Sequence, residues 1–403
     1  GIGNYHEKPP TVYTHAVMSG MRPRTVSTNP LFKTAVVHNQ RLYVGNVSHK
    51  TPESPSTRRS YPDRMLKSLK NRHDCIPDNQ YVDVVRRDGE NIVRLESLGN
   101  RLFQFKERTL YVLVSAGQEE YLEGTYAGMG ILHPEAVASS PYGLFWVNEF
   151  GAYIFPIGGE SSNPQSITDG KIDKDDWANF ITEHSICTYL PTHKSFCVIK
   201  SCLTSGDSDE TGGTEVYMFN LLTKSWTTLE GKFGEDSGED CISNICNYLD
   251  SNGVNHIVHH ENQGSILEWK NGKDVLSSSA TATHKLSFIT KELTGDAPHL
   301  RKKFYKLYIT YKTSETNNST NNPDVKVHLI GPDGQNDTCT LVTTDGGFEN
   351  TAVYKTSTWK LSEADASKGK NVYSVKIEIS GDAVRQDFFI NDMSIVVRRK
   401  SAK

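Results

Sequence analysis

The sequence predicts an all-β protein in which β-propeller-like repeats precede an antiparallel β-sandwich of jelly-roll type. Short runs of Val, Ile, Tyr, Phe and Leu, bounded by Gly, Asn and Asp, recur along the whole chain. Helical periodicity is confined to residues 173–181. The 403 residues suffice for two or more domains, and 36% of them are apolar. No apolar run comes near the roughly 20 residues that a membrane helix needs.

The first part of the chain consists of strand–turn–strand units. They recur about every 40 to 50 residues, which is the spacing of propeller blades. The units cover residues 31–45, 92–114, 142–155, 185–200, 215–229 and 242–269. They make about five blades, each of which must stack on its neighbours to cover its own faces. We expect a propeller-like domain over residues 1–272, with residues 1–30 or a segment preceding Gly1 completing the ring. An irregular pair of β-sandwiches is the alternative.

One short helix is expected at residues 173–181. Its first turn is acidic, which suits the partial positive charge of a helix N-terminus, and three apolar side chains share one face. The acidic residues are Asp173, Asp175 and Asp176, and the apolar ones are Trp177, Phe180 and Ile181. A calcium loop is the alternative, but the glycine and the distal Glu of an EF-hand are missing.

A second domain is expected over residues 282–403, after a polar linker at residues 273–281. The charge changes sign there. Residues 281–403 hold 18 basic and 14 acidic side chains, a net +4, which leaves −8 of the total of −4 to residues 1–280. The expected strands are residues 285–289, 303–311, 324–329, 338–343, 373–380, 387–390 and 393–398. About seven largely alternating runs in about 120 residues favour an antiparallel sandwich.

Catalytic and metal-binding motifs are sparse, so we expect no enzyme, no cofactor, no metal ion and no small-molecule substrate. The seven cysteines include no Cys-x-x-Cys pair, and no Gly-x-Ser-x-Gly elbow or phosphate-binding loop occurs. Cys197 and Cys246 are interpreted as small buried residues in strands. Histidines at positions 256, 259 and 260 form one cluster, which strand alternation splits between two faces. The carboxylates of residues 207–210 and 235–240 are interpreted as solvated loops, with calcium as the alternative.

Two groups of basic residues are candidate interaction sites. The first, within residues 58–73, suits the phosphates of nucleic acid. It also contains Leu66 and Leu69 and follows a Pro-containing loop, so an exposed arm that docks on a neighbouring protein is at least an equal interpretation. The second group flanks the expected strands of the sandwich. The candidate residues are Arg58, Arg59, Arg64, Lys67, Lys70, Arg301, Lys302, Lys303, Arg398, Arg399 and Lys400. The near-neutral charge of the whole chain argues against a dedicated nucleic-acid surface.

Two passages resemble structural proteins of tailed bacteriophages. Residues 99–113 and 130–155, which read GNRLFQFKERTLYVL and GILHPEAVASSPYGLFWVNEFGAYIF, are similar to the propeller of tail nozzle, tail-hub and neck-stabilising proteins. Residues 301–312 and 387–400, which read RKKFYKLYITYK and DFFINDMSIVVRRK, are similar to the terminal β-domain of the same class. Together these passages cover about a sixth of the chain, and none of them is a catalytic motif.

The resemblance implies a non-enzymatic virion structural protein that is made in the bacterial host cytoplasm. It implies assembly in several copies around the tail or neck axis, where the protein holds the DNA-exit conduit together. The implied partners are other copies of the chain in a ring, other neck, tail or portal-associated proteins and, in passing, genomic DNA, but no membrane. We expect the −8 domain of one copy to meet the +4 domain of the next.

Carbohydrate or receptor binding by a lectin-like module is the alternative function. It requires tryptophans that present their rings to a sugar. The candidates are Trp177, Trp226, Trp269 and Trp359, whose apolar surroundings instead favour core packing.

Overall fold

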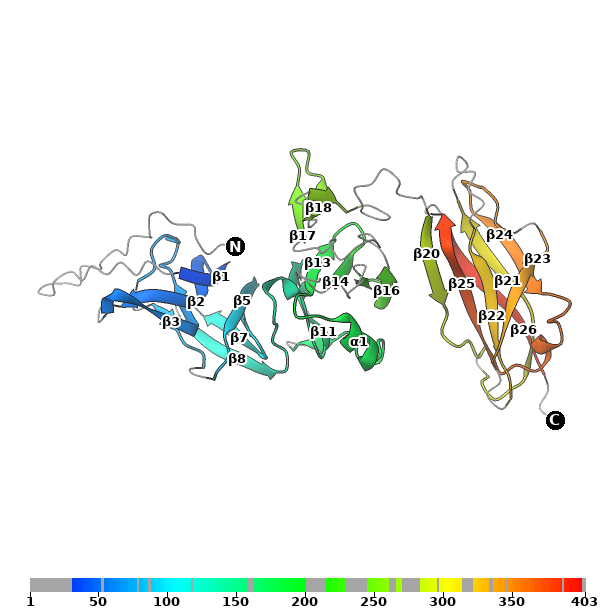
Figure 1. The fold of residues 1–403 in the computed structure, drawn as a ribbon, viewed down its shortest axis with the longest axis horizontal. Coiled ribbons are helices and arrows are strands. Elements are labelled where there is room, and N and C mark those ends of the chain that lie inside the picture. The colour runs from blue at the N-terminus through cyan, green and yellow to red at the C-terminus, as the bar shows by residue number, and fades with distance from the viewer. Residues whose placement is uncertain are drawn as a thin grey trace, which may run out of the picture. The chain divides into compact units, whose positions relative to one another are not determined.

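A computed structural model of the chain describes residues 31–51, 54–77, 80–85, 88–116, 119–157, 163–200, 215–229, 245–260, 266–269, 283–295, 297–313, 322–332, 336–345, 347–385 and 388–400. The chain divides into two compact units, Gly1–Trp269 and Lys270–Lys403 (Figure 1). The expected linker and the carboxylate clusters at residues 207–210 and 235–240 lie outside the described residues.

Five antiparallel sheets follow one another along the first unit, and the strands of each are neighbours in chain order. The first two sheets contain β1 (Leu31–His38), β2 (Arg41–Thr51), β3 (Ser54–Lys67) and β4 (Tyr81–Val82), then β5 (Ile92–Leu98), β6 (Arg101–Lys106), β7 (Thr109–Ala116) and β8 (Glu119–Ala127). The next two contain β9 (Val137–Ser140), β10 (Gly143–Asn148), β11 (Gly151–Pro156) and β12 (Gln165–Ser166), then β13 (Ile186–Leu190), β14 (Ser195–Ile199), β15 (Val216–Asn220) and β16 (Ser225–Leu229). The fifth contains β17 (Ile245–Leu249), β18 (Asn255–His260) and β19 (Ile266–Glu268). Successive meander sheets are the repeat of a propeller, so the all-β, propeller-like fold is confirmed.

Tight turns between neighbouring strands come from residues that tolerate a left-handed backbone. Asn39 and Gln40, with φ of 45° and 62°, join β1 to β2, as a two-residue hairpin turn requires. Gly99, with φ of 61°, begins the turn from β5 to β6, where a side chain is strained. The polar turns in the sequence therefore mark the ends of strands correctly.

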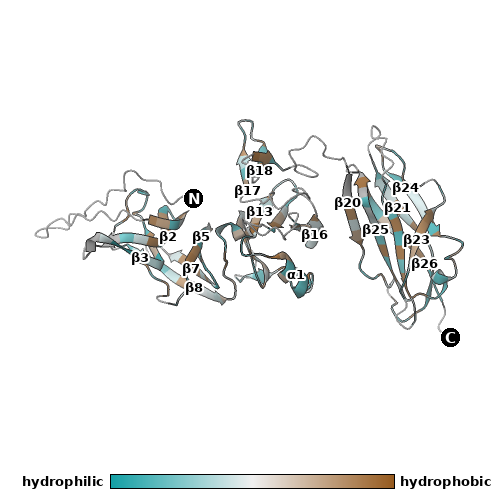
Figure 2. Cartoon of the chain, viewed as in Figure 1, coloured by the Kyte–Doolittle hydropathy of each residue, from teal (hydrophilic) through white to brown (hydrophobic). Residues whose placement is uncertain are grey.

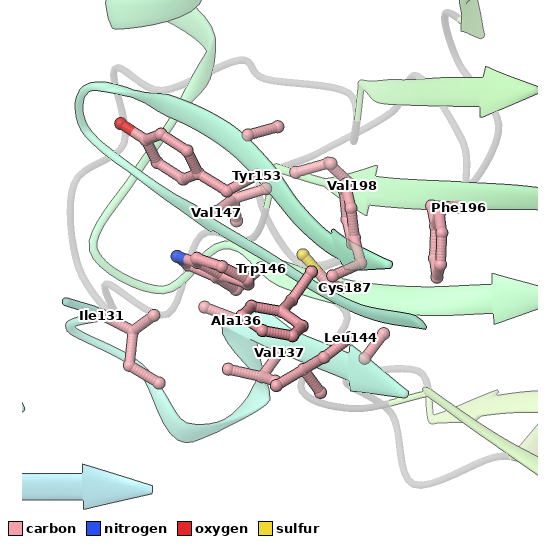
Figure 3. Close-up of a cluster of buried hydrophobic side chains, with 14 of the residues drawn as sticks. Ile131, Ala136, Val137, Leu144, Trp146, Val147, Tyr153, Cys187, Phe196 and Val198 are labelled. Carbon is pink, nitrogen blue, oxygen red and sulfur yellow. The ribbon is translucent and has the colours of Figure 1, made fainter. Parts of the chain in front are cut away.

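Each sheet packs against the next through buried apolar side chains. Between the second and third sheets, Phe105 meets Trp146 edge to face, with ring centroids 5.5 Å apart. Between the third and fourth, Phe145 stacks on Phe196 at 4.5 Å. Figure 3 shows Trp146 and Phe196 within this cluster. The other two interfaces are formed by Tyr43, Met65, Ile92 and Leu102, and by Ile186, Cys197, Ile245 and Ile257.

The short helix α1 (Lys174–Phe180) confirms the interpretation of the acidic stretch. Asp173 is its N-cap, and the carboxylate accepts a hydrogen bond from the backbone N–H of Asp175 at 2.9 Å. Trp177 and Phe180 are buried against the fourth sheet, where Phe180 lies 4.2 Å from the ring of Tyr217. The carboxylates therefore serve the start of a helix.

The second unit is an antiparallel sandwich. Its strands are β20 (Thr283–Ile289), β21 (Lys302–Lys312), β22 (Asp324–Ile330), β23 (Asn336–Thr343), β24 (Lys355–Leu361), β25 (Ser374–Arg385) and β26 (Phe389–Arg399), with a short 3-10 helix, η3 (Lys368–Lys370). Their order is β20-β25-β22-β23-β24-β21-β26. One half of β23 pairs with β22 and the other with β24, so this strand passes from one layer to the other. The inner faces of both layers share one apolar core, and the strands alternate in hydropathy (Figure 2).

Several details differ from the sequence-based expectation. β3, in the stretch interpreted as an arm that docks on a neighbour, pairs within the first sheet, and β8 is a further strand that was not expected. β24 was not expected, because its core side consists of Ser357 and Trp359 between exposed Thr and Lys residues. The two expected strands at residues 387–390 and 393–398 form the single strand β26. Cys246 is exposed on β17, whereas Cys197 is buried as expected.

Candidate interaction surface

Arg64, from the first basic group, makes contacts within its own sheet. Its guanidinium donates to both carboxylate oxygens of Asp83, at 2.9 and 2.8 Å. It also lies 4.3 and 4.4 Å from the ring centroids of Tyr61 and Tyr81. The hydrogen bond to Asp83 raises the pKa of Arg64, so the pair is well matched electrostatically. These contacts leave Arg64 little surface for a partner.

Lys67 lies in a buried ion pair between the first two sheets. Its ammonium is 2.6 Å from the carboxylate of Glu120, and the two side chains are only 11% and 7% exposed. The Tyr43 hydroxyl donates to the other oxygen of Glu120 at 2.5 Å. Burial, followed by this hydrogen bond, raises the pKa of Tyr43. The group therefore satisfies buried charges where two sheets meet.

The remaining members of the first group lie at the surface of β3 and the turn after it. Arg58 donates to the carbonyl of Ser48 at 3.2 Å, while Arg59 and Lys70 are exposed. Arg59 and Lys70 remain accessible to a partner, whereas Lys67 is paired with Glu120.

His38 adds a titratable group to the same interface, and we expect it to make the first unit sensitive to acid. It is 2% exposed, and its ring nitrogens lie 2.7 and 2.9 Å from the hydroxyls of Ser97 and Ser115. Burial lowers the pKa of His38 below 6.5, although Glu120 opposes the shift. The unfolded chain therefore binds the proton more readily. The contribution of neutral His38 to the free energy of unfolding is fully present above pH 6.5 and falls as the pH drops below it.

Urea unfolding of the first unit at a series of pH values measures this effect, with His38→Gln as the comparison. The variant is expected to lose part of the acid dependence, since glutamine does not titrate. His133, whose pKa burial also lowers, contributes equally to both proteins. Identical pH dependence in the two proteins would contradict the prediction.

The second basic group is brought together by strand pairing. β21 and β26 are antiparallel neighbours, and their register places Lys302 opposite Arg399 and Lys303 opposite Arg398. Arg301 and Lys400 flank this pairing, and the backbone N–H of Lys400 donates to the carbonyl of Arg301 at 2.8 Å. Residues almost 100 positions apart in the sequence thus form one basic end of the sandwich.

Lys302 is a correction to the expected interaction group, because it is buried. It is 2% exposed, and its ammonium donates to the carbonyls of Ala297, Leu300 and Tyr373 at 2.6, 3.0 and 2.8 Å. Desolvation, and secondarily the charge of Arg399, lowers the pKa of Lys302. Lys302 therefore joins the segment before β21 to the start of β25 and is not accessible to a partner.

Two members of this group, Lys303 and Arg398, lie on the outer face of the layer that β24, β21 and β26 form. We define the basic face by the cations Lys303, Lys306, Lys360 and Arg398 and the tyrosines Tyr305 and Tyr308. Lys306 lies directly opposite Lys360. The ammonium of Lys303 is 4.5 Å from the ring centroid of Tyr305, and that of Lys306 is 5.0 Å from Tyr308.

The outer face of the other layer is electrostatically different. Glu378 lies 3.3 Å from the ammonium of Lys326 and 2.7 Å from Nε2 of His328. The pKa of Glu378 is lowered by hydrogen bonds from Ser380, His328 and Lys326, whereas burial raises it. The negative charge of Glu378 is therefore well compensated. On the basic face, none of the four cations forms an ion pair with a carboxylate within the described part of the chain. The two faces of the sandwich thus differ in how far their charges are matched.

Sequence reasoning missed Lys306, Lys360 and both tyrosines of the basic face. The alternation along residues 306–311 indicated that Lys306 and Tyr308 share the outer side of a strand. Lys360 lies on the unexpected strand β24, and its position opposite Lys306 depends on a pairing that no local pattern indicates.

The histidine cluster does not form a metal site within the described ranges. His256 Nδ1 lies 2.6 Å from Glu268, and its Nε2 lies 3.6 Å from Asp250. The hydrogen bond that His256 donates to Glu268 is the main cause of the raised pKa of His256. A pocket of about 400 Å³ beside α1 is lined by His133, Asn148, Glu149, Phe150 and Glu183, among others. His133 Nδ1 there accepts a hydrogen bond from the N–H of Glu135.

The candidate tryptophans for sugar binding pack inward or are partly covered. Trp177 and Trp359 are 3% and 7% exposed. Trp226 is half-buried and donates from Nε1 to the carbonyl of Ile167 at 2.8 Å. Trp269 is half-buried beside the fourth and fifth sheets. The described surface therefore offers no tryptophan platform at these positions.

The first unit belongs to the class of proteins built from successive meander sheets packed face to face. No protein-family description matches the chain, and no curated protein matches it. Among solved structures, Hsv2 of Kluyvelomyces marxianus is 8% identical, with a TM-score of 0.32, and the match covers 60% of this chain and 73% of that one. The Pan2 WD40 domain of Neurospora crassa is also 8% identical, with a TM-score of 0.32 and coverage of 58% and 72%. A luciferin-regenerating enzyme is 11% identical, with a TM-score of 0.30 and coverage of 88% and 95%.

No helix within the described ranges is long and apolar enough to cross a membrane.

Proposed function

We propose that the chain is a non-enzymatic virion structural protein of a tailed bacteriophage. It assembles in several copies around the tail or neck axis and helps to hold the DNA-exit conduit together. Its partners are other copies of the chain and other neck, tail or portal-associated proteins. The proposal starts from the resemblance of residues 99–113, 130–155, 301–312 and 387–400 to such proteins.

The observation that supports it best is that ionisable groups in the interior form ion pairs and hydrogen bonds that join parts of the chain. Arg64 is paired with Asp83, Lys67 with Glu120, and Lys302 with three backbone carbonyls. These groups cross-link neighbouring strands, sheets or loops and are not gathered in a shared cavity. Together with the aromatic contacts between successive sheets, they suit a part whose role is mechanical.

Assembly of this kind is expected to depend on salt, because the two parts of the chain carry opposite net charges of −8 and +4. We expect the full-length chain to form oligomers of defined mass at low ionic strength and to dissociate as salt is added. Sedimentation velocity over a range of protein and salt concentrations measures the mass, and negative-stain images show whether the oligomers are rings. A monomer at every protein and salt concentration would count against the proposal.

A further inference from the structure

The basic face of the sandwich carries like charges in direct opposition. Lys303 is paired with Arg398 across β21 and β26, and Lys306 with Lys360 across β21 and β24. Side chains opposite each other on one face of an antiparallel pair have Cβ atoms about 5 Å apart, and like charges there oppose pairing. The outer face of the other layer differs, because Glu378 there lies beside Lys326 and His328 and compensates their charge. An anionic ligand on the basic face removes the repulsion.

Tyr305 lies between these two pairs of cations along β21, and Tyr308 follows Lys306 on the same outer side. Tyr305 is the additional residue of a β-bulge, since Phe304 pairs with Val397 and Lys306 with the adjacent Val396. A bulge redirects a side chain out of the regular alternation, and Tyr305 is 39% exposed. Tyr308 is half-buried on the same outer side as Lys306. Rings and ammonium groups therefore alternate along one strand.

We propose that the basic face binds single-stranded nucleic acid, with the phosphates at the cations and unstacked bases on Tyr305 and Tyr308. A sheet surface that combines aromatic rings with flanking cations offers both contacts that a nucleotide makes with such a protein. The ammonium of Lys303 lies 4.5 Å from the ring of Tyr305, so the base and the phosphate of one nucleotide reach both groups. The carboxylates of an acidic protein surface pair with the cations, but they do not stack on the tyrosine rings. The proposal does not rest on assembly, since all six residues lie in one unit.

Fluorescence anisotropy of the full-length chain with a labelled oligothymidylate tests this binding. Four phosphate contacts predict a slope of about −3 for the logarithm of the affinity against the logarithm of the salt concentration. The double variant Lys306→Met/Lys360→Met removes two of the cations and is expected to bring the slope to about −1.4. Lys326→Met/Lys376→Met removes the same charge from the opposite face and is expected to leave both slope and affinity unchanged.

Tyrosine variants separate stacking from charge. Tyr308→Ala is expected to weaken binding at least about fivefold with an unchanged salt slope, and Tyr308→Phe is expected to bind as the parent does. A blunt duplex of the same length is expected to bind more weakly, because its bases are not available to the rings. Thermal unfolding of each variant shows that the sandwich remains folded.

Four results would overturn the proposal. They are absence of binding at low salt, an equal loss in the opposite-face variant, equal affinity for the duplex, and equally tight competition by polyglutamate. The last result would instead assign the face to an acidic protein. Because oligomer mass is measured separately, loss of nucleic-acid binding and loss of assembly are distinguishable.

Discussion

Replacing Trp146 by alanine is expected to destabilise the first unit by about 3–5 kcal/mol, which is the usual cost of truncating a fully buried aromatic side chain. Trp146 is 0% exposed. It contacts Phe105 of the second sheet at 5.5 Å and stacks on Tyr153 of its own sheet at 5.6 Å. The truncation thus leaves a cavity where two sheets meet, and the neighbouring rings close it only in part.

Hydrogen exchange measured by mass spectrometry under increasing denaturant reports on each unit separately. Peptides of the first unit are expected to lose protection at lower denaturant in Trp146→Ala, while those of the second unit are unaffected. Phe150→Ala is the control, since this aromatic residue lies in the same hairpin but is 65% exposed. An equal loss in both variants would show that the interface is not the source of the effect.

The polar edge of Trp146 allows a finer test. Its Nε1–H finds no acceptor among the described residues. Trp146→Phe therefore removes volume together with a buried donor that is not satisfied. We expect this variant to lose less stability than Trp146→Ala, by at least about 1 kcal/mol. The comparison separates packing from hydrogen bonding at one position.

Replacing Lys302 by methionine is expected to destabilise the second unit by about 2–4 kcal/mol. Methionine fills a similar volume, but the carbonyls of Ala297, Leu300 and Tyr373 lose their common donor. Each carbonyl left unsatisfied in a buried site costs about 1–3 kcal/mol. The total is smaller than for three such groups, because the Ala297 carbonyl still accepts from the backbone N–H of Leu300 at 3.2 Å. The effect is large because one side chain joins the segment before β21 to the start of β25.

Lys303→Met is the matched control, since the neighbouring side chain lies on the outer face and contacts Tyr305. It is expected to change stability by less than about 0.5 kcal/mol. Chemical denaturation followed by exchange in peptides of the second unit measures both variants. If Lys302→Met is as stable as Lys303→Met, the three carbonyls are not held by this ammonium in solution.

Prediction from sequence succeeded where a local pattern carries the information. Hydrophobic runs separated by Asn and Gly turns predicted strands such as β5 and β6, because turn residues and side-chain alternation act over a few positions. α1 was predicted from its capping carboxylate and its apolar face. β24 escaped prediction because its buried side needs only Ser357 and Trp359, which a pattern of apolar residues does not detect.

The candidate surface was predictable only as a set of basic residues. Two adjacent lysines on a strand face opposite sides, and nothing in Lys302-Lys303 indicates which one is buried. The packing of residues 297–300 and 373 around Lys302 decides this. The opposition of Lys306 and Lys360 likewise depends on a pairing between strands about 50 residues apart.

The amino-acid order thus accounts for the all-β character, for the positions of most strands and turns, and for the change of charge between the two parts of the chain. These properties depend on side-chain chemistry and on neighbours within a few residues. The pairing of β21 with β24 and β26, the burial of Lys302 and the basic face depend on contacts between distant residues. Such contacts form when the whole sandwich buries its apolar core, since the register that best covers that core also fixes what each strand presents to solvent.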